Sequence, residues 1–258
     1  MSRLDGRCAV VTGAARGLGL ATARRLAAAG AHVLLSDTCA DEGEAQAGIL
    51  RGEGHDAYFV AHDVTDPADW AALLDVAVGR WGRVDILVNN AGIAEIADIE
   101  TLDFAGWRRT LSVNLDSVFL GTQAAIARMK VSGGGAIVNV ASIEGLVGEP
   151  LLPAYNASKG GVRLLTRSAA IHCASRGYGI RINAVCPGFA NTRMISGAVG
   201  TMSPRDADTF ALRLMSRIPM HRFADPDEIA RAVVFLASDD SSYMTGADLV
   251  IDGGYTAC

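Results

Sequence analysis

A tyrosine and a lysine four positions apart, in the run Tyr155-Asn156-Ala157-Ser158-Lys159, are the residues of this chain best suited to chemistry. On a helix, side chains at this spacing lie on one face, about one turn apart. A phenol has a pKa near ~10 in water and exchanges its proton poorly at neutral pH. An ammonium group beside it favours the phenolate and lowers that pKa. The pair therefore predicts proton transfer with an alcohol or carbonyl oxygen, although the spacing alone also fits a solvated surface pair.

A glycine-rich turn, Thr12–Gly19, follows an apolar run near the start of the chain. Glycine lets such a turn close tightly and lets the backbone approach a pyrophosphate, and the next helix offers free N–H groups to the phosphates. Gly13, Gly17 and Gly19 follow the spacing G-x-x-x-G-x-G rather than the better-known G-x-G-x-x-G. An ordinary tight turn therefore stays open as an alternative.

An acid suited to a cofactor ribose is Asp37, which ends an apolar run about twenty residues beyond the glycines. A carboxylate there accepts hydrogen bonds from the adenosine ribose diol and repels the 2′-phosphate of NADP. Arg16 favours the opposite choice, because its guanidinium beside the phosphate loop suits a 2′-phosphate. We weight Asp37 more heavily and predict NAD as the cofactor.

The elements that must position these residues alternate along the chain. Short runs of Val, Ile, Leu and Ala are typical of strands buried on both faces of a parallel sheet, and amphipathic, helix-length stretches separate them. The alternation predicts an α/β fold, a doubly wound, Rossmann-like parallel sheet of about seven strands with helices on both faces. We expect strands at 8–12, 32–36, 57–61, 86–88, 136–140, 181–185 and 248–251, and helices at about 17–29, 41–53, 67–81, 104–129, 154–175 and 226–238.

We interpret residues 1–258 as a single dinucleotide-binding and catalytic domain, because no linker, repeat or low-complexity tract divides the chain. The least regular stretch, 187–222, combines glycines and prolines with apolar residues between the last two expected strands. A long insertion at the carboxyl end of a sheet is usually functional. We therefore predict a substrate-covering lid there, with a pair of packed surface helices as the alternative.

The composition excludes several classes of protein. Hydrophobic residues make up 50% of the chain and charged residues 20%, which is typical of a globular protein. A formal net charge of −5 with mixed signs argues against nucleic-acid binding. No run reaches the ~20 apolar residues of a membrane span, and the N-terminus lacks a signal-peptide core, so we expect a soluble, cytoplasmic protein. The 5 cysteines are scattered without a C-x-x-C pair, and we assign them no metal or redox role.

Taken in order, the motifs of this chain resemble those of the short-chain dehydrogenase/reductase family. The resemblance covers nearly the whole chain, and chance could supply any one motif but not the ordered set. The motifs are Thr12–Gly19, Asp63-Val64, Asn89–Gly92, Asn114, Ser142, Tyr155 with Lys159, Pro187-Gly188 with Thr192, and Asp252-Gly253-Gly254.

The resemblance implies a catalytic site of four residues. Tyr155 would be the general acid/base, and Lys159 would lower its pKa and bind the nicotinamide ribose. Ser142 would bond the substrate oxygen and stabilise its developing charge. Asn114 would hold a water that links Lys159 to solvent. The alternatives are that Ser142 is an ordinary turn residue and that Asn114 is a helix-interior group bonded to backbone. No metal is implied, because these residues supply both proton transfer and charge stabilisation.

For the cofactor, the resemblance implies contacts from the glycine-rich turn to the end of the sixth strand. Asp63 and Val64 would flank the adenine, Asn90–Gly92 would line the ribose and pyrophosphate, and the Phe189 backbone and Thr192 would bind the carboxamide. An acid that only forms a turn is the alternative for Asp63. The full set is Gly13, Arg16, Gly17, Leu18, Gly19, Asp37, Asp63, Val64, Asn90, Ala91, Gly92, Tyr155, Lys159, Pro187, Gly188, Phe189 and Thr192.

Segments 141–148 and 252–257 resemble those of bacterial secondary-alcohol dehydrogenases, both R-selective ketone reductases and cyclic-alcohol dehydrogenases. We therefore predict an NAD-dependent oxidoreductase that interconverts a hydrophobic secondary alcohol and its ketone. Glu144 is the polar exception in an apolar pocket, and it either contacts substrate or lies in water at the mouth. The predicted substrate contacts are Ser142, Glu144, Val147, Leu152, Tyr155, Phe189 and Met194.

Three other functions stay open. Similar segments occur in bacterial hydroxysteroid dehydrogenases. A 3-oxoacyl-carrier-protein reductase would normally use NADP and offer basic residues to an acidic carrier, which Asp37 and the net charge of −5 disfavour. A non-enzymatic NAD-binding regulator is disfavoured by the intact catalytic set. The family is commonly tetrameric, so we also expect a homotetramer with the 104–129 and 154–175 helices at an interface.

Overall fold

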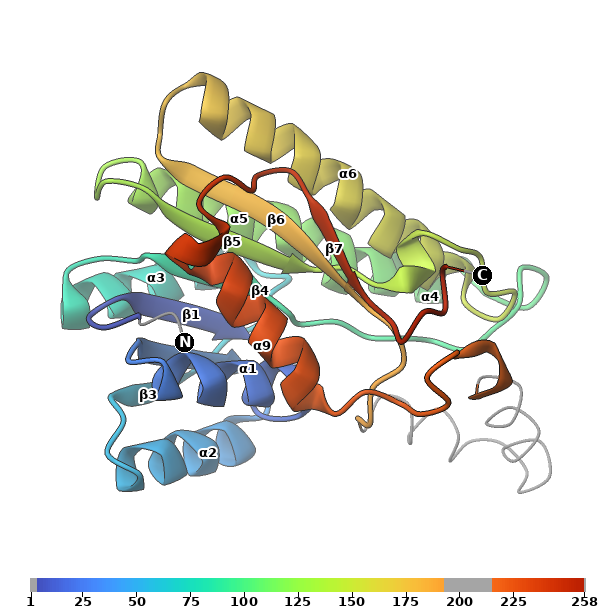
Figure 1. Ribbon diagram of the computed structural model, residues 1–258, viewed down its shortest axis with the longest axis horizontal. Coiled ribbons are helices and arrows are strands. Elements are labelled where there is room, and N and C mark those ends of the chain that lie inside the picture. The colour runs from blue at the N-terminus through green and yellow to red at the C-terminus, as the bar shows by residue number, and fades with distance from the viewer. Residues whose placement is uncertain (1–3, 193–214, 258) are drawn as a thin grey trace.

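The strands form one parallel sheet of 7 strands in the computed structural model, which describes residues 4–192 and 215–257 (Figure 1). Their order is β3-β2-β1-β4-β5-β6-β7, so the sheet grows in one direction from β1 and then in the other from β4. At such a switch point the carboxyl ends of the strands open a crevice for a ligand. The predicted doubly wound sheet is confirmed. The strands are β1 Cys8–Thr12, β2 His32–Asp37, β3 Ala57–Ala61, β4 Ile86–Asn89, β5 Gly135–Val140, β6 Ile180–Pro187 and β7 Asp248–Ile251.

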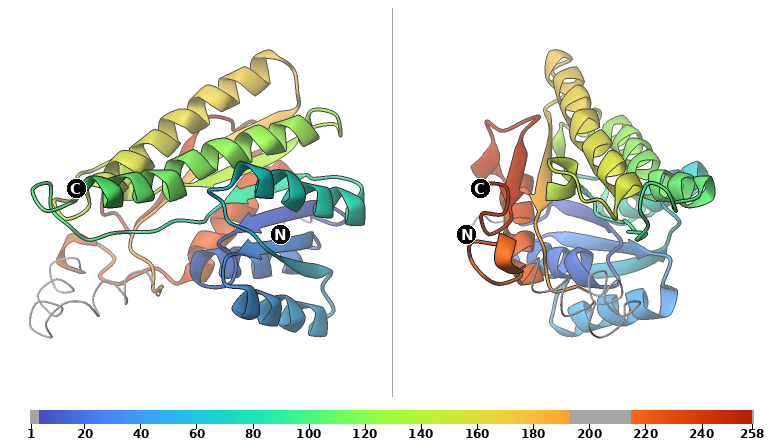
Figure 2. Two further views of the ribbon diagram at one scale, coloured as in Figure 1. Left: turned by 180° about the vertical axis from the view of Figure 1, so that it is seen from behind. Right: turned by 90° about the vertical axis from the view of Figure 1, so that its right-hand side faces the viewer.

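Two helical layers cover the sheet (Figure 2). Helices α1, α2 and α9 pack on one face through side chains such as Leu26 and Val233, and α3, α5 and α6 pack on the other through Trp70 and Met129. Because both faces are covered, the strands carry apolar residues on both sides, and β1 is buried along its whole length. The helices are α1 Gly17–Ala28, α2 Ala40–Gly52, α3 Pro67–Trp81, α4 Phe104–Leu111, α5 Ser117–Met129, α6 Pro153–Ser175 and α9 Pro226–Ala237.

Side-chain caps fix where several helices begin. The Asp66 side chain accepts a 2.8 Å hydrogen bond from the Ala68 N–H at the start of α3, and Pro67 occupies the first turn. Asp225 and Glu228 form a capping box at the start of α9. These caps explain why the predicted helix starts at 67 and 226 agree with the structure.

The predicted continuous helix over 104–129 is wrong in one respect. A π-helical turn, Ser112–Asp116, separates α4 from α5, and the Ser117 N–H donates to the Ser112 carbonyl five residues back. Asn114 lies in this turn and is fully buried. Hydrophobic periodicity cannot show such a turn, because the apolar residues on either side still follow helical spacing.

The predicted lid, 187–222, falls mostly on residues 193–214, which lie outside the described residues. The chain just before these residues lies next to the chain shortly after them. Ala190 pairs with Ala224 in a short parallel bridge, and the Asn191 N–H donates a 3.0 Å hydrogen bond to the Ala224 carbonyl. Among the helices of the described part, none combines the length and apolar character that crossing a membrane requires.

Candidate active site

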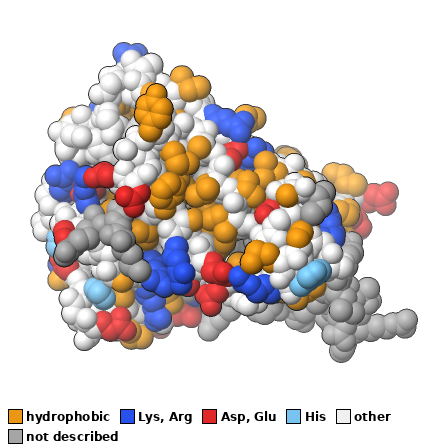
Figure 3. Space-filling view, viewed as in Figure 1, with side chains coloured by type: hydrophobic (Ala, Val, Ile, Leu, Met, Phe, Trp, Pro, Cys, Tyr) orange, Lys and Arg blue, Asp and Glu red, His pale blue; other side chains and the backbone are white. Residues whose placement is uncertain are grey.

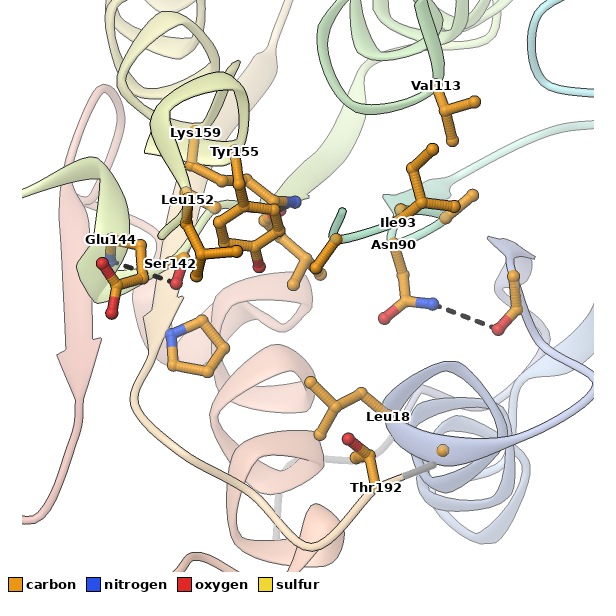
Figure 4. Close-up of a pocket in the computed structure, with 18 of the residues that line it drawn as sticks. Leu18, Asn90, Ile93, Val113, Ser142, Glu144, Leu152, Tyr155, Lys159 and Thr192 are labelled. Atoms are coloured by element: carbon orange, nitrogen blue, oxygen red, sulfur yellow. Dashed lines mark hydrogen bonds between the residues drawn. The ribbon is translucent and has the colours of Figure 1, made fainter. Parts of the chain in front are cut away.

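A cavity of about 1230 Å³ opens at the carboxyl ends of the strands. Residues at or just after the carboxyl end of each strand from β1 to β6 line it, among them Gly13, Asp37, Asn90 and Pro187. Figure 4 shows Ser142 and Tyr155 together on one side, with Asn90, Leu18 and Thr192 across the opening. The sheet topology therefore gathers residues far apart in sequence around one pocket.

Two hydroxyl groups form the wall where chemistry is expected. Ser142 follows β5 and caps a short 3₁₀ turn, Ile143–Gly145, and its Oγ accepts a 3.1 Å hydrogen bond from the Glu144 N–H. Tyr155 lies in the first turn of α6, which Pro153 starts. The Ser142 hydroxyl lies close enough to the Tyr155 phenol to lower its pKa. Because the backbone N–H occupies a lone pair of Ser142 Oγ, the Ser142 proton is free to point toward an incoming oxygen.

Burial dominates the acidity of the tyrosine. It raises the pKa of Tyr155 to about 12, the Ser142 hydroxyl lowers it in part, and the charge of Glu144 raises it further. The cost of removing the phenolate from water outweighs the other contributions, and the predicted lowering of this pKa by Lys159 stays a prediction. Tyr155 is therefore a phenol at neutral pH, which is the form that donates a proton.

Lys159 lies behind the tyrosine, one turn farther along α6. Its side chain is 3% exposed, and its Nζ donates a 2.8 Å hydrogen bond to the Val140 carbonyl. Burial lowers the pKa of Lys159 to about 8, with a smaller opposite effect from Cys186. The carbonyl at the end of β5 therefore fixes an ammonium group at the floor of the pocket.

Asn114 is bonded to backbone, as the alternative interpretation expected. Its Oδ1 accepts a 2.8 Å hydrogen bond from the Ile93 N–H, and its Nδ2 donates to the Ile93 carbonyl at 2.9 Å and to Ser158 Oγ at 3.2 Å. A Cβ added to Gly92 would lie 3.3 Å from Asn114 Oδ1 and 3.6 Å from Lys159 Nζ. Asn114 thus holds the loop after β4 in place close to Lys159. A water relay through it stays a prediction.

The glycine-rich turn has the features that a dinucleotide pyrophosphate requires. Gly13 has a φ of +62°, and a Cβ there would lie 2.9 Å from the Ala91 Cα. Asn90 Nδ2 ties the turn down with hydrogen bonds to the Thr12 carbonyl at 2.8 Å and the Gly13 carbonyl at 3.1 Å. The α1 N-terminus has no side-chain cap from Arg16 and no acid in its first turn. Its N–H groups therefore fit a bound phosphate.

Asp37 lies where an acid for the ribose is expected. Its Oδ2 accepts a 3.1 Å hydrogen bond from the Ala15 N–H and its Oδ1 a 3.0 Å bond from the Cys39 N–H, so the carboxylate is fixed beside the phosphate loop. Arg16 reaches the same area, with Nη2 3.1 Å from Cys39 Sγ and Nη1 3.6 Å from a Glu42 carboxylate oxygen. These groups fit the adenosine end of a nicotinamide dinucleotide.

Asp63 both forms a turn and lies at the cavity, so it has features of the turn acid and of the predicted cofactor contact. Its Oδ1 accepts hydrogen bonds from the Thr65 N–H at 2.9 Å and from Thr65 Oγ1 at 2.8 Å, and these bonds lower the pKa of Asp63. The residue is thus a turn acid, and it also lines the cavity with Val64.

Comparisons with known proteins agree with this site. Residues 13–256 match a family described as "Enoyl-(Acyl carrier protein) reductase". The chain is 44% identical over 259 residues to the NADP-dependent (R)-specific alcohol dehydrogenase of Lentilactobacillus kefiri, covering 99% of this chain and 98% of the relative. It is 48% identical over 252 residues to the cis-4-hydroxycyclohexanecarboxylate dehydrogenase of Sinomonas cyclohexanicum, covering 97% of each. The crystal structure of levodione reductase superimposes with a TM-score of 0.94 at 36% identity, covering 99% of this chain and all of that one. The chain belongs to the short-chain dehydrogenase/reductase family.

In this short-chain dehydrogenase/reductase, most of the predicted site residues line the cavity, but some do not. Gly19 and Val147 are not among its described lining residues. A Cβ on Gly19 would lie 2.1 Å from the Gly13 carbonyl oxygen, so this glycine serves the packing of α1 on the turn. Val147 packs instead beside Ile143, against a cluster with Tyr255. Asn114 lies behind the wall, and Met194 lies outside the described residues.

Several lining residues of this family member were not predicted. Some directly follow or precede a recognised motif, so their position in the sequence was a usable signal. Arg109 comes from α4, Ser112 and Val113 come from the π-turn that contains Asn114, and nothing in the sequence marked Glu149. The residues that sequence reasoning missed are Thr38, His62, Thr65, Ile93, Ala94, Ile96, Arg109, Ser112, Val113, Val140, Ala141, Ile143, Glu149 and Ala190.

Proposed function

We propose that the protein is an NAD-dependent short-chain alcohol dehydrogenase that interconverts a hydrophobic secondary alcohol and its ketone. The observation that carries this proposal is the pairing of the Ser142 and Tyr155 hydroxyl groups on one wall of the cavity, with the Lys159 ammonium group behind them. Two hydroxyls directed at one substrate oxygen can move its proton and stabilise its charge.

The residues divide the work on the substrate oxygen. The Ser142 O–H group donates a hydrogen bond to that oxygen. It is oriented to do so because its own oxygen already accepts from the Glu144 N–H. Tyr155 Oη gives a proton to the oxygen in ketone reduction and takes it back in alcohol oxidation. Lys159, held by the Val140 carbonyl, supplies positive charge on the far side of the phenol. A nicotinamide cofactor, when bound, supplies the hydride acceptor or donor.

The cavity lining supports an apolar substrate. Beyond Ser142 and Tyr155 the wall carries aliphatic side chains, from the loop after β4 and from the segment before α6. Such walls favour a hydrophobic ring or chain over a sugar. The names of the two relatives, an (R)-specific alcohol dehydrogenase and a hydroxycyclohexanecarboxylate dehydrogenase, support a secondary or cyclic alcohol. The aliphatic lining residues are Ile93, Ala94, Ile96, Leu151 and Leu152.

NAD is the proposed cofactor on the strength of Asp37. Its fixed carboxylate beside Ala15 lies where the 2′-substituent of the adenosine ribose is expected, and a negative charge there opposes a 2′-phosphate. The Lentilactobacillus kefiri relative is NADP-dependent, so cofactor choice is a property to measure on this chain.

A homotetramer is the proposed assembly. Large apolar side chains are exposed on the predicted interface helices, where Phe104 is 75%, Leu164 65% and Ile171 69% exposed. Figure 3 shows further hydrophobic side chains across the middle of another face, around β6 and β7, where Val250 is exposed. Covering such surfaces removes apolar area from water. Light scattering coupled to size exclusion checks the mass of the assembly.

The deciding experiment is a panel of substrates assayed with NAD and NADP. Cyclic alcohols, both enantiomers of 1-arylethanols, and steroids are oxidised, and acetoacetyl thioesters are reduced, with purified protein. The proposal expects turnover of cyclic or aryl alcohols with NAD. Faster turnover of acetoacetyl thioesters would instead favour a 3-oxoacyl-carrier-protein reductase. Cofactor binding without any turnover would favour a non-enzymatic regulator.

A further inference from the structure

The side chain of Asn156, next to Tyr155, makes an unusually complete set of hydrogen bonds. Its Nδ2 donates to the Glu144 carbonyl at 2.6 Å, to the Val147 carbonyl at 3.0 Å and to Glu144 Oε2 at 3.1 Å. Its Oδ1 accepts from the Glu149 N–H at 3.2 Å. Carbonyl and carboxylate oxygens surround the nitrogen and an N–H faces the oxygen, so the neighbours fix the amide orientation.

All of these partners belong to one segment, 144–149, which begins two residues after Ser142. The Ser142 Oγ is bonded to the Glu144 N–H, and the Glu144 carbonyl is bonded to Asn156. One residue therefore connects the hydrogen bond that orients Ser142 to the helix that carries Tyr155. Ser142 arrives from β5 and Tyr155 from α6, so their separation depends on how this segment sits on the helix.

The segment also meets α6 at two later turns. A Cβ on Gly145 would lie 2.7 Å from the Lys159 carbonyl carbon, so the two backbones are in close contact there. Arg163 Nη1 donates to the Gly145 carbonyl, and the same guanidinium pairs with Asp248 on β7. Positions 156, 159–160 and 163 lie on one side of a helix. Asn156 is the contact of this row nearest the reacting groups.

Because Glu144 is buried, its carboxyl group depends on the Asn156 side-chain amide as a hydrogen-bond donor. Glu144 is 4% exposed, and its Oε1 has no hydrogen-bond partner within the described structure. Asn156 is a donor to the other oxygen. Removing the amide would leave a buried carboxyl group and two carbonyls without this donor, and the segment would have to move to satisfy them.

We propose that Asn156 is a positioning residue that sets the separation of Ser142 and Tyr155 by holding segment 144–149 against the first turn of α6. The role rests on the proposed function, because it matters through the two hydroxyls that act on the substrate oxygen. Asn156 itself touches neither substrate nor cofactor in this proposal.

The test compares Asn156→Ala with Arg167→Ala. Arg167 lies farther along the same helix and pairs with Asp248, so its removal disturbs α6 without the Asn156 contacts. We expect Asn156→Ala to lower kcat about 10- to 100-fold, because a displacement on the order of 1 Å has that effect on catalysis. The Kd for NADH, measured by fluorescence, stays within about 2-fold of wild type, because the cofactor contacts are elsewhere. Arg167→Ala should have the same kcat as wild type.

Hydrogen exchange measures, without any substrate, how firmly Asn156 holds segment 144–149. In Asn156→Ala, the amides of Glu144 and Glu149 should exchange about 10-fold faster than in wild type, while amides of β1 and β2 keep their rates. Unchanged exchange over 144–149, or a kcat within about 2-fold of wild type, would overturn the proposal. Faster exchange throughout the protein would also overturn it, because Asn156 would then serve only general stability. If the wild type oxidises no alcohol, the proposed function fails separately, and the exchange comparison still decides whether Asn156 holds the segment.

Discussion

The Nζ of Lys159 lies 5.5 Å from the centre of the Tyr155 ring and donates its hydrogen bond to the Val140 carbonyl. Burial shifts the two groups in opposite directions, raising the pKa of Tyr155 to about 12 and lowering that of Lys159 to about 8. Both shifts have the same cause, because burial removes water from the charged form, yet at neutral pH a pKa of about 12 leaves Tyr155 neutral whereas a pKa of about 8 leaves Lys159 mostly charged. The proton therefore rests on the phenol at neutral pH, which is the form that the proposed ketone reduction uses.

Replacing Tyr155 with Phe removes the proton donor and leaves the ring. We expect kcat to fall about 10²- to 10⁴-fold, the usual contribution of a general acid or base. The Kd for NADH should change little. Steady-state assays and fluorescence titration measure the two quantities, and Tyr178→Phe, whose ring lies beside His172 far along α6, is the matched control. Turnover close to that of wild type would remove Tyr155 from the mechanism.

The pH dependence should differ between the two directions. Because the pKa of Tyr155 is raised, the basic form needed for alcohol oxidation is scarce at neutral pH and grows as pH rises. Oxidation should therefore accelerate from about pH 6 to about pH 9, whereas ketone reduction uses the form already present and should not. Profiles of kcat/KM in both directions test this. Oxidation that slows with rising pH would contradict the assigned protonation state.

Asp37→Asn should shift the cofactor preference toward NADP. The amide oxygen can still accept from the Ala15 N–H or the Cys39 N–H, so the loop keeps its shape while the negative charge is lost. We expect the ratio of kcat/KM for NADP to that for NAD to rise about 10- to 100-fold, since like charges in contact cost several kcal/mol. Glu44→Gln, on the exposed side of α2, controls for net charge. An unchanged ratio would mean that Asp37 does not choose the cofactor.

Asn139→Ala should destabilise the fold itself. Asn139 Oδ1 accepts a 2.8 Å hydrogen bond from Asn89, and its Nδ2 donates a 2.9 Å bond to Thr166, all of them buried. Its loss leaves polar groups unpaired and opens a small cavity, and we expect a loss of ~2–4 kcal/mol in the free energy of unfolding. Urea denaturation measures it, with Gln46→Ala, whose hydrogen bond from Arg24 lies at the surface, as control. A loss below ~0.5 kcal/mol would show that water satisfies the network.

The positions of the strands and the doubly wound sheet could be predicted because short apolar runs mark the strands and helix-length stretches separate them. The Val- and Leu-rich runs of β1 and β2 are buried on both faces, and that burial is what removes polar alternation from the sequence. The Tyr155–Lys159 spacing likewise predicts two side chains on one helical face, since helix geometry fixes it.

The parts that could not be predicted depend on contacts between segments. The acidity of Tyr155 depends on how much water the fold removes, and this cannot be deduced from its neighbours in sequence. Val147 looks like a pocket residue by its position, yet the turn after Ser142 directs it toward Tyr255. The role of Asn156 was not predicted from the Tyr155–Lys159 motif, because its partners lie in segment 144–149 and only the folded structure brings that segment to α6.

The π-turn around Asn114 has a consequence for how this chain can vary. A π-turn contains one residue more than an α-helical turn, so deleting a single residue in Ser112–Asp116 would convert it to regular helix. The rest of α5 could keep its packing on the sheet, while the side chain at position 114 would turn away from the Ile93 backbone. A change of one residue in length there would leave the sheet assembled but release from Asn114 the loop after β4, whose residues Ile93 and Ala94 line the pocket.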